Sequence, residues 1–199
     1  MIRTLKKIFS PSVMHNALEQ FGTISIKSFI QYALLGIGIV AMIIVVRKIM
    51  KKKTLVCDVL SSVVLAVYGS VMLQLTLICR ESGSRIGIDL DLFNGLMGPE
   101  NAVRWLMWAY VILNCLLFIP FGFTISLFSF VNDRKPSIQA LSVALVSFIC
   151  SMAIECIQLI TQRGYFEMQD LVINTLGGVI GWVIFSFIYH LGALIYDKS

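Results

Sequence analysis

Charged residues are scarce in this sequence. Only 14% of the residues are charged, whereas 58% are hydrophobic, and the mean hydropathy is +0.87. A soluble domain carries about 25% charged residues, so this composition excludes a soluble globular protein. The apolar residues form continuous runs instead of alternating with polar ones, which predicts membrane-spanning helices and excludes a β-barrel.

Familiar catalytic and ligand-binding patterns are also missing. The sequence contains no HExxH, GxSxG or P-loop motif and no Asp-rich motif of the kind found in membrane enzymes of lipid-phosphate chemistry. Its five cysteines form no CxxC pair, and His15 and His190 lie far apart. The sequence therefore predicts no metal site, no disulfide framework and no cofactor. The net charge of +5 comes from basic residues beside apolar runs, which indicates membrane topology and contact with anionic lipids and argues against nucleic acid as a partner.

Five apolar runs are long enough to cross a bilayer. They cover about residues 24–46, 56–79, 110–130, 138–160 and 171–195. At a rise of about 1.5 Å per residue, each run spans a hydrocarbon core of about 30 Å. We therefore expect an all-α, polytopic transmembrane helical bundle. The basic segment before the runs, residues 1–23, has apolar residues at helical spacing and a break at Pro11, which is typical of an amphipathic helix at the membrane interface.

The distribution of Lys and Arg predicts the orientation of the loops. The 47–55 loop has five basic residues and no acid, and the 131–137 loop contains Arg134 and Lys135. Because basic loops stay in the cytoplasm, we expect these two loops and the C-terminus to be cytoplasmic and loops 80–109 and 161–169 to be extracellular. Five spans then place the N-terminus outside, although its basic residues favour the cytoplasm, so the side of the N-terminus stays open.

The 80–109 loop contains local structure signals. Asn94-Gly95 predicts a turn. Pro99 suits the first position of a helix, with Glu100 in the first turn. Trp105, Trp108 and Tyr110 predict an aromatic belt where the third run enters the headgroup region.

Polar residues recur in and beside the last two apolar runs. Glu155 and Gln158 are three residues apart and share one helix face, and Asp170 and Asn174, four apart, do the same. Because the connection between the runs is short, the two helices pack antiparallel and their polar faces meet. Arg163 lies in this connection and can pair with Glu155, with Asp170 or with both, since an unpaired carboxylate costs about 2.5–3.5 kcal/mol in a membrane.

Two interpretations of these residues stay open. The first is a structural clasp between the last two helices, supported by the close approach that Gly177 and Gly181 permit. The second is a ligand pocket near the outer surface, to which Asn114 adds an amide from the third run beside the kink expected at Pro120 and Gly122. Glu155 and Asp170 are candidates for an acid–base pair, but two carboxylates beside an arginine more often form an ion pair.

The spacing of these residues resembles the VanZ-like family of bacterial membrane proteins. The family has an Asn-x-x-x-Phe-x-Pro-x-Gly segment followed by Glu-x-x-Gln, Arg, Asp and Asn-x-x-Gly. The matching residues here are Asn114, Phe118, Pro120, Gly122, Glu155, Gln158, Arg163, Asp170, Asn174 and Gly177. The resemblance covers about residues 56–195. Two departures are the element "DLFNGL", which lacks the proline of the family's Asn-Leu-x-Pro-Phe, and the added apolar run at 24–46.

The resemblance implies an organisation and a role. It divides the chain into the N-terminal segment 1–23, an added transmembrane helix with a basic loop at 24–55, and a four-helix core at 56–199. It implies a plasma-membrane protein of the bacterial cell envelope, accessory to resistance against teicoplanin-type glycopeptides and lipoglycopeptides. The expected partners are membrane lipids, a cell-wall precursor lipid or the antibiotic itself.

We expect a non-enzymatic protein with an outward-facing polar pocket. Arg163 would bind an anionic group of the ligand, with Glu155 and Asp170 positioning the arginine. Amide hydrogen bonds would come from Asn114, Gln158 and Asn174. The alternative is a membrane-embedded enzyme that acts on a lipid or peptidoglycan precursor with Glu155 and Asp170 as its catalytic groups.

Overall fold

Five long helices dominate the computed structural model, which describes residues 6–19, 25–51, 54–83, 86–93, 96–97 and 99–196. They are α3 (Ile26–Ile49), α4 (Val56–Leu73) with the π-helix η1 (Gln74–Ile78) at its end, α5 (Ala102–Ser126), α7 (Pro136–Ile160) and α8 (Met168–Tyr196). All five are long and apolar enough to cross a membrane. The all-α polytopic bundle expected from the sequence is therefore confirmed.

Four short elements connect or cover the long helices. They are α2 (Pro11–Glu19), α6 (Ser129–Asn132), β1 (Ile88–Asp89) and β2 (Phe166–Glu167). The two strands pair in parallel, with Ile88 beside Phe166. This pairing ties the loop before α5 to the connection between α7 and α8.

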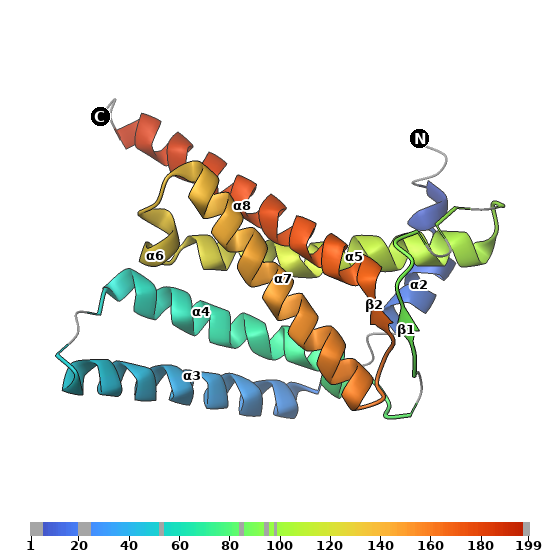
Figure 1. The fold of residues 1–199 in the computed structure, drawn as a ribbon, viewed down its shortest axis with the longest axis horizontal. Coiled ribbons are helices and arrows are strands. Elements are labelled where there is room, and N and C mark those ends of the chain that lie inside the picture. The colour runs from blue at the N-terminus through green and yellow to red at the C-terminus, as the bar shows by residue number, and fades with distance from the viewer. Residues whose placement is uncertain are drawn as a thin grey trace.

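The bundle has two chemically different ends (Figure 1). The end that we call the basic end holds the α3–α4 connection, α6 with the connection to α7, and the last turns of α8. The opposite end, here the loop end, holds α2, β1 and β2. The loops that the Lys and Arg bias assigns to one side of the membrane thus lie together.

Glycines bring α5 and α8 into backbone contact. A side chain at Gly122 would collide with the backbone of Gly178, and a side chain at Gly181 would collide with the backbone of Ile119. Gly177 likewise packs on the Cys115 carbonyl. Small residues permit such close approach between membrane helices. The crossing brings the first turns of α8 against the middle of α5, where Asn114 lies.

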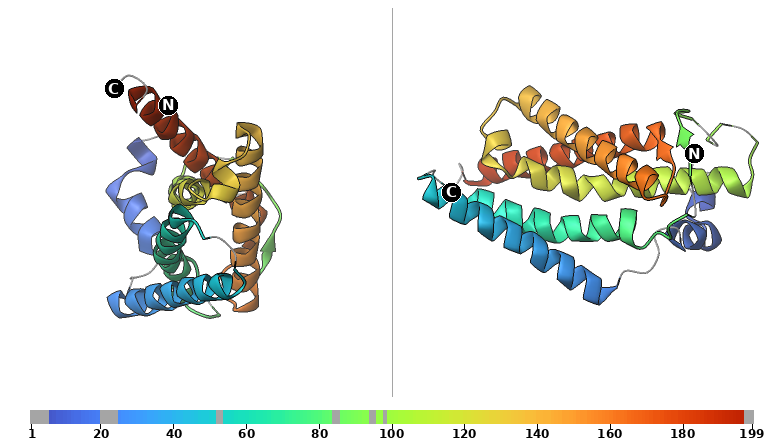
Figure 2. Two further views of the ribbon diagram at one scale, coloured as in Figure 1. Left: turned by 90° about the vertical axis from the view of Figure 1, so that its left-hand side faces the viewer. Right: turned by 60° about the horizontal axis from the view of Figure 1, so that its bottom comes forward.

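The added helix α3 is the outermost of the five. It packs mainly on α4, where a side chain at Gly36 would touch the Ala66 methyl group at 3.0 Å. Ala33 is its single buried residue among those described. Away from this contact α3 tilts from α4 toward the loop end (Figure 2). Most of α3 is therefore exposed on the surface of the bundle.

The start of α5 differs from the expectation. The helix begins at Ala102, eight residues before the expected start at 110, and ends at Ser126, not at 130. Its N-cap is Asn101, whose side chain accepts a hydrogen bond from the Arg104 amide at 2.9 Å. Pro99 and Glu100 therefore precede the helix, and the prediction that they form its first turn is wrong because the Asn101 side chain supplies the N-cap. The turn expected at Asn94-Gly95 lies outside the described residues.

The N-terminal segment lies against the first turns of α5. Ile8 and Ala17 are buried and pack with Trp105 and Ala109. Lys7 Nζ also lies 2.9 Å from a carboxylate oxygen of Glu100. The hydrogen bond and charge of Lys7 hold the pKa of Glu100 below its ordinary value. The apolar side chains of the N-terminal segment therefore pack on the helical bundle.

Candidate functional site

The end of α4 determines where several polar side chains go. In the π-helix η1 the backbone bonds shift from i→i+4 to i→i+5, as from the Cys79 amide to the Gln74 carbonyl at 2.9 Å. The last carbonyls of a helix have no partner within it. Here Gln158 Nε2 binds the Thr76 carbonyl at 2.9 Å, and Arg163 Nη1 binds the Leu77 carbonyl at 2.6 Å. These two side chains therefore cap α4 from the α7–α8 hairpin.

The expected ion pair of Arg163 with Glu155 or Asp170 is not formed. Its Nη1 atom also approaches the Ile78 and Arg80 carbonyls at 3.2 and 3.1 Å. The salt bridges among the described residues do not include Arg163. The prediction is wrong because the guanidinium instead binds carbonyl groups at and after the end of η1, and no sequence motif indicates those acceptors.

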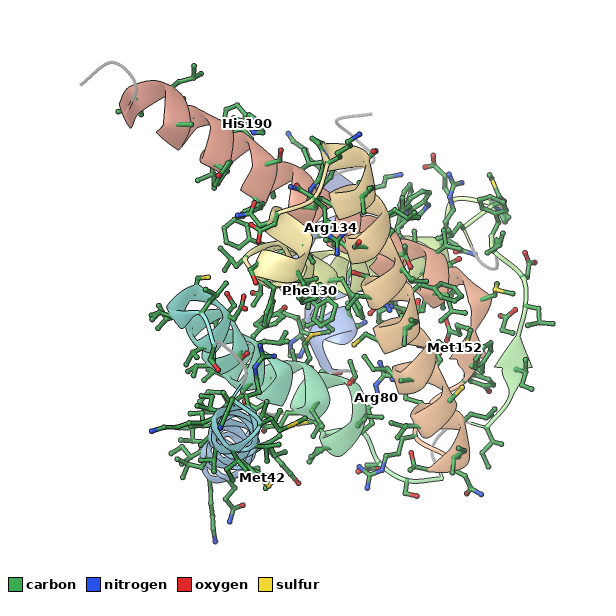
Figure 3. All side chains as sticks on the ribbon, turned by 60° about the vertical axis from the view of Figure 1, so that its left-hand side comes forward. Met42, Arg80, Phe130, Arg134, Met152 and His190 are labelled. Carbon is green, nitrogen blue, oxygen red and sulfur yellow. The ribbon has the colours of Figure 1, made fainter. Side chains whose placement is uncertain are left out.

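Arg80 is the cation that acts on the two carboxylates. Its charge interacts with Glu155 and with Asp170, and these two acids also interact with each other. Arg80 directly follows the η1 turn, and its Nη1 atom lies against Gly164. Figure 3 shows Arg80 between the end of α4 and α7. Arg163 thus binds the carbonyl groups at the end of α4, while Arg80 is the arginine that interacts with Glu155 and Asp170.

Asp170 and Glu155 also have hydrogen-bond partners. The Asn114 side chain of α5 donates to the Asp170 carboxylate. Glu155, which is 2% exposed, accepts a 2.9 Å bond from the backbone amide of Glu167, just before α8 begins. Both carboxylates therefore lie at the N-terminus of α8, where the helix dipole stabilises negative charge. The hydrogen bonds offset part of the cost of burying two acids in a largely apolar bundle.

A polar stripe runs down the buried face of α7 below Glu155. Ser151 and Ser147 lie one and two turns along the helix from Glu155, and both are completely buried. Asn174 of α8 donates to the Ser151 hydroxyl at 2.8 Å, while the Asn174 carbonyl oxygen and the Ser147 hydroxyl have no partner among the described residues. The polar faces of α7 and α8 therefore meet, as the spacing predicted.

Gln74 is the most unusual buried side chain. It is 0% exposed, and neither atom of its amide has a partner within the described part of the chain. A buried amide without a partner costs about 1–3 kcal/mol. Gln74 begins the π-turn η1, and single π-turns are frequent at functional sites. No motif pointed to Gln74, because a single Gln in an apolar run has no local signature.

Two grooves border this polar region. One has a volume of about 350 Å³ and lies between α3, η1 and the end of α7, with Leu73, Ile157 and Arg163 in its lining. The other, of about 720 Å³, lies at the loop end between β1, the start of α5 and β2, and includes Tyr110 and Tyr165. Both volumes fall in the range of ligand sites.

The structure gathers the residues expected to bind a ligand into two neighbouring groups. The first group contains Asn114, Glu155, Asp170 and Asn174, with Arg80 added. The second contains Gln158 and Arg163 on the end of α4. Phe118, Gly122, Gly177 and Gly181 lie in the α5–α8 crossing, and Pro120 is an exposed residue within α5.

Reactive or metal-binding groups contribute little to this region. Among the described residues, no group of three or more His, Cys, Asp or Glu side chains is arranged to hold a metal ion. Cys79 adjoins Arg80, but burial raises the pKa of its thiol above the ordinary value, so the thiolate needed for nucleophilic attack is disfavoured. The chemistry available is therefore that of carboxylates, amides and arginines.

Comparison with known proteins agrees with the geometry. The model of the family described as VanZ/LLP1 matches residues 61–189, well over half of the chain. That region holds α5, α7 and most of α8 with both polar groups, and it leaves out α3. Neither the curated proteins nor the solved structures that were compared include a match. The chain is a multi-pass membrane protein that belongs to the VanZ/LLP1 family.

Proposed function

We propose that this protein binds the polar headgroup of an envelope amphiphile at the loop end of its bundle, on the outer side of the bacterial plasma membrane. The observation that carries the proposal is the cluster of Asn114, Glu155, Asp170 and Arg80, which four separate parts of the fold bring together. Buried ionisable groups are costly in membranes and mark functional sites.

Arg163 supports the same function from the second group. Only its Nη1 atom has a hydrogen-bond partner among the described residues. The Nε and Nη2 edge of a guanidinium matches a phosphate or carboxylate in a bidentate manner. Arg163 lines the 350 Å³ groove, whose other walls include Leu77 and Ile157. An anionic headgroup on this edge would leave its hydrocarbon chain beside apolar side chains.

The candidate ligands share this amphiphilic chemistry. They are a membrane lipid, a cell-wall precursor lipid or a lipoglycopeptide such as a teicoplanin-type antibiotic. Binding of the antibiotic or of its target would lower the susceptibility of the cell, as the family resemblance implies. The basic end, with Arg47 and Arg134, would then face the cytoplasm.

The experiment uses Asp170→Asn, because Arg163 also caps α4 and its loss would confuse binding with folding. Binding of a fluorescent teicoplanin and of a fluorescent anionic phospholipid is measured on the purified chain. We expect Asp170→Asn to weaken binding of one of the probes by about tenfold, the equivalent of one lost hydrogen bond to a charged group. Glu19→Gln, which removes an exposed acid of α2 at the same end, serves as the control.

Two results would contradict the proposal. One is that wild-type protein binds neither probe. The other is that Asp170→Asn keeps wild-type affinity at a normal unfolding temperature. If Asp170→Asn instead lowers the unfolding temperature and leaves the affinity of the folded fraction intact, the cluster is a structural clasp.

The second candidate function is an enzyme acting on a lipid or peptidoglycan precursor. One observation favours it: Glu155 and Asp170 lie close enough to interact, beside a cation. Such a pair can serve in general acid–base catalysis. Glu155→Gln would then preserve fold and ligand binding but abolish turnover. Lipid extracts from cells that overproduce the wild type would contain a new product. If these extracts have the same composition as extracts from control cells, the result counts against catalysis.

A further inference from the structure

A third groove lies at the basic end, away from the polar cluster. Its volume is about 230 Å³. The walls come from the last turns of α3 and the first turns of α4, and Phe128 and Phe130 before and within α6 complete them. The family match begins at residue 61, so α3 and the first turn of α4 lie outside it. The groove is thus built largely by the part of the chain that the family model does not cover.

The walls of this groove are apolar on the α3 side. Val40, Ile43 and Ile44 line it from α3, and Val59 lines it from α4. Ile43 is 51% exposed and Phe130 is 57% exposed. In a membrane, apolar side chains exposed at this depth are suited to contact with hydrocarbon chains.

One edge of the groove is polar, and the basic end of the bundle around this edge has a net positive charge. Arg47 and Asp58 line this edge. The Asp58 carboxylate accepts 2.8 Å bonds from the amide and the hydroxyl of Ser129, which hold it in place at this edge. The described cations of the basic end are Arg47, Lys48, Lys51, Arg134 and Lys135, against the two acids Asp58 and Asp133. A negative headgroup is therefore attracted to this end.

Together, the apolar walls and the cationic edge select one class of molecule. We infer that the groove between α3 and α4 binds an anionic phospholipid, with its phosphate at Arg47 and an acyl chain along Ile43 and Ile44. Because α3 packs mainly on α4, a lipid that contacts both helices stabilises their pairing. A ligand that binds the folded state alone raises the unfolding temperature. This site is independent of the proposed headgroup site at the loop end.

The test compares two lipids with identical acyl chains on the full chain in a neutral detergent. Phosphatidylglycerol should raise the unfolding temperature, and phosphatidylcholine should not. Arg47→Gln should lower the apparent affinity for phosphatidylglycerol about fivefold, the effect of one cation near a lipid phosphate. Lys51→Gln removes an equal charge from the same end but outside the groove lining, and it should leave the affinity unchanged.

A second variant tests the apolar half of the groove. Ile44→Trp fills the groove from α3 while Arg47 stays in place, so it should abolish the shift with phosphatidylglycerol. If Arg47→Gln does not fold, Ile44→Trp still tests whether the lipid binds in this groove. Equal effects of Arg47→Gln and Lys51→Gln would mean unspecific surface attraction and would overturn the inference. An equal shift with phosphatidylcholine, an equal shift with soluble glycerol phosphate, or full binding to Ile44→Trp would do the same.

Discussion

Arg163 has a structural task that its charge alone does not reveal. Its Nη1 atom serves three carbonyl groups at the end of α4, from Leu77, Ile78 and Arg80. We expect Arg163→Ala to lower the free energy of unfolding by about 1–3 kcal/mol, because hydrogen bonds from a charged donor to partly buried acceptors are lost. Thermal unfolding in detergent measures the effect. Arg134→Ala, at an exposed position of the basic end, should change it by less than about 0.5 kcal/mol.

Gln74 should behave in the opposite way. Since its buried amide has no partner among the described residues, Gln74→Leu should stabilise the protein by about 1 kcal/mol through removal of an unsatisfied group. The contrasting variant is Gln139→Leu. Gln139 donates to the Asn132 and Arg134 carbonyls and accepts from Trp182, so its loss should be destabilising. A destabilised Gln74→Leu protein would contradict this prediction.

At the scale of elements, the α5–α8 crossing is held by backbone contact. A methyl group at Gly181 would collide with the Ile119 backbone of α5, while a methyl group at Gly192 in the same helix meets nothing within 4 Å. We expect Gly181→Ala to destabilise the protein by about 1–3 kcal/mol through overpacking. Gly192→Ala should be neutral or stabilising by up to about 1 kcal/mol, because Ala favours helix more than Gly does. Similar unfolding temperatures for the two variants would contradict the tight crossing.

The crossing also connects fold and site. It places Asn114 of α5 against Asp170 of α8, and the short α7–α8 connection places Glu155 beside them. The sequence predicts the hairpin of α7 and α8 because local polar spacing shows which faces meet. It does not predict the cap on η1, because Arg163 and the carbonyls that it binds are more than 80 residues apart in the chain.

At the scale of the whole molecule, the two ends of the bundle should lie on opposite sides of the membrane. In a variant without the five native cysteines, Ser82→Cys at the loop end and Ser137→Cys at the basic end provide exposed labels. A membrane-impermeant maleimide should label Ser82→Cys in intact cells and Ser137→Cys only after permeabilisation, since basic loops stay in the cytoplasm. The reverse pattern would place the proposed headgroup site inside the cell.

The sequence alone determines the class of protein, five spans and the pairing of two polar helix faces. These follow from hydrophobic run length and helical periodicity, which are local properties. The tertiary structure alone decides which arginine serves the carboxylates. Arg163 follows Glu155 by only eight residues in the sequence, yet it binds the orphan carbonyls of η1. Arg80 is instead the cation whose charge acts on Glu155 and Asp170. The unpaired carbonyl groups at a helix end bind donors that are close in space but can be distant in the chain. Spacing along the sequence therefore does not predict which side chain binds them.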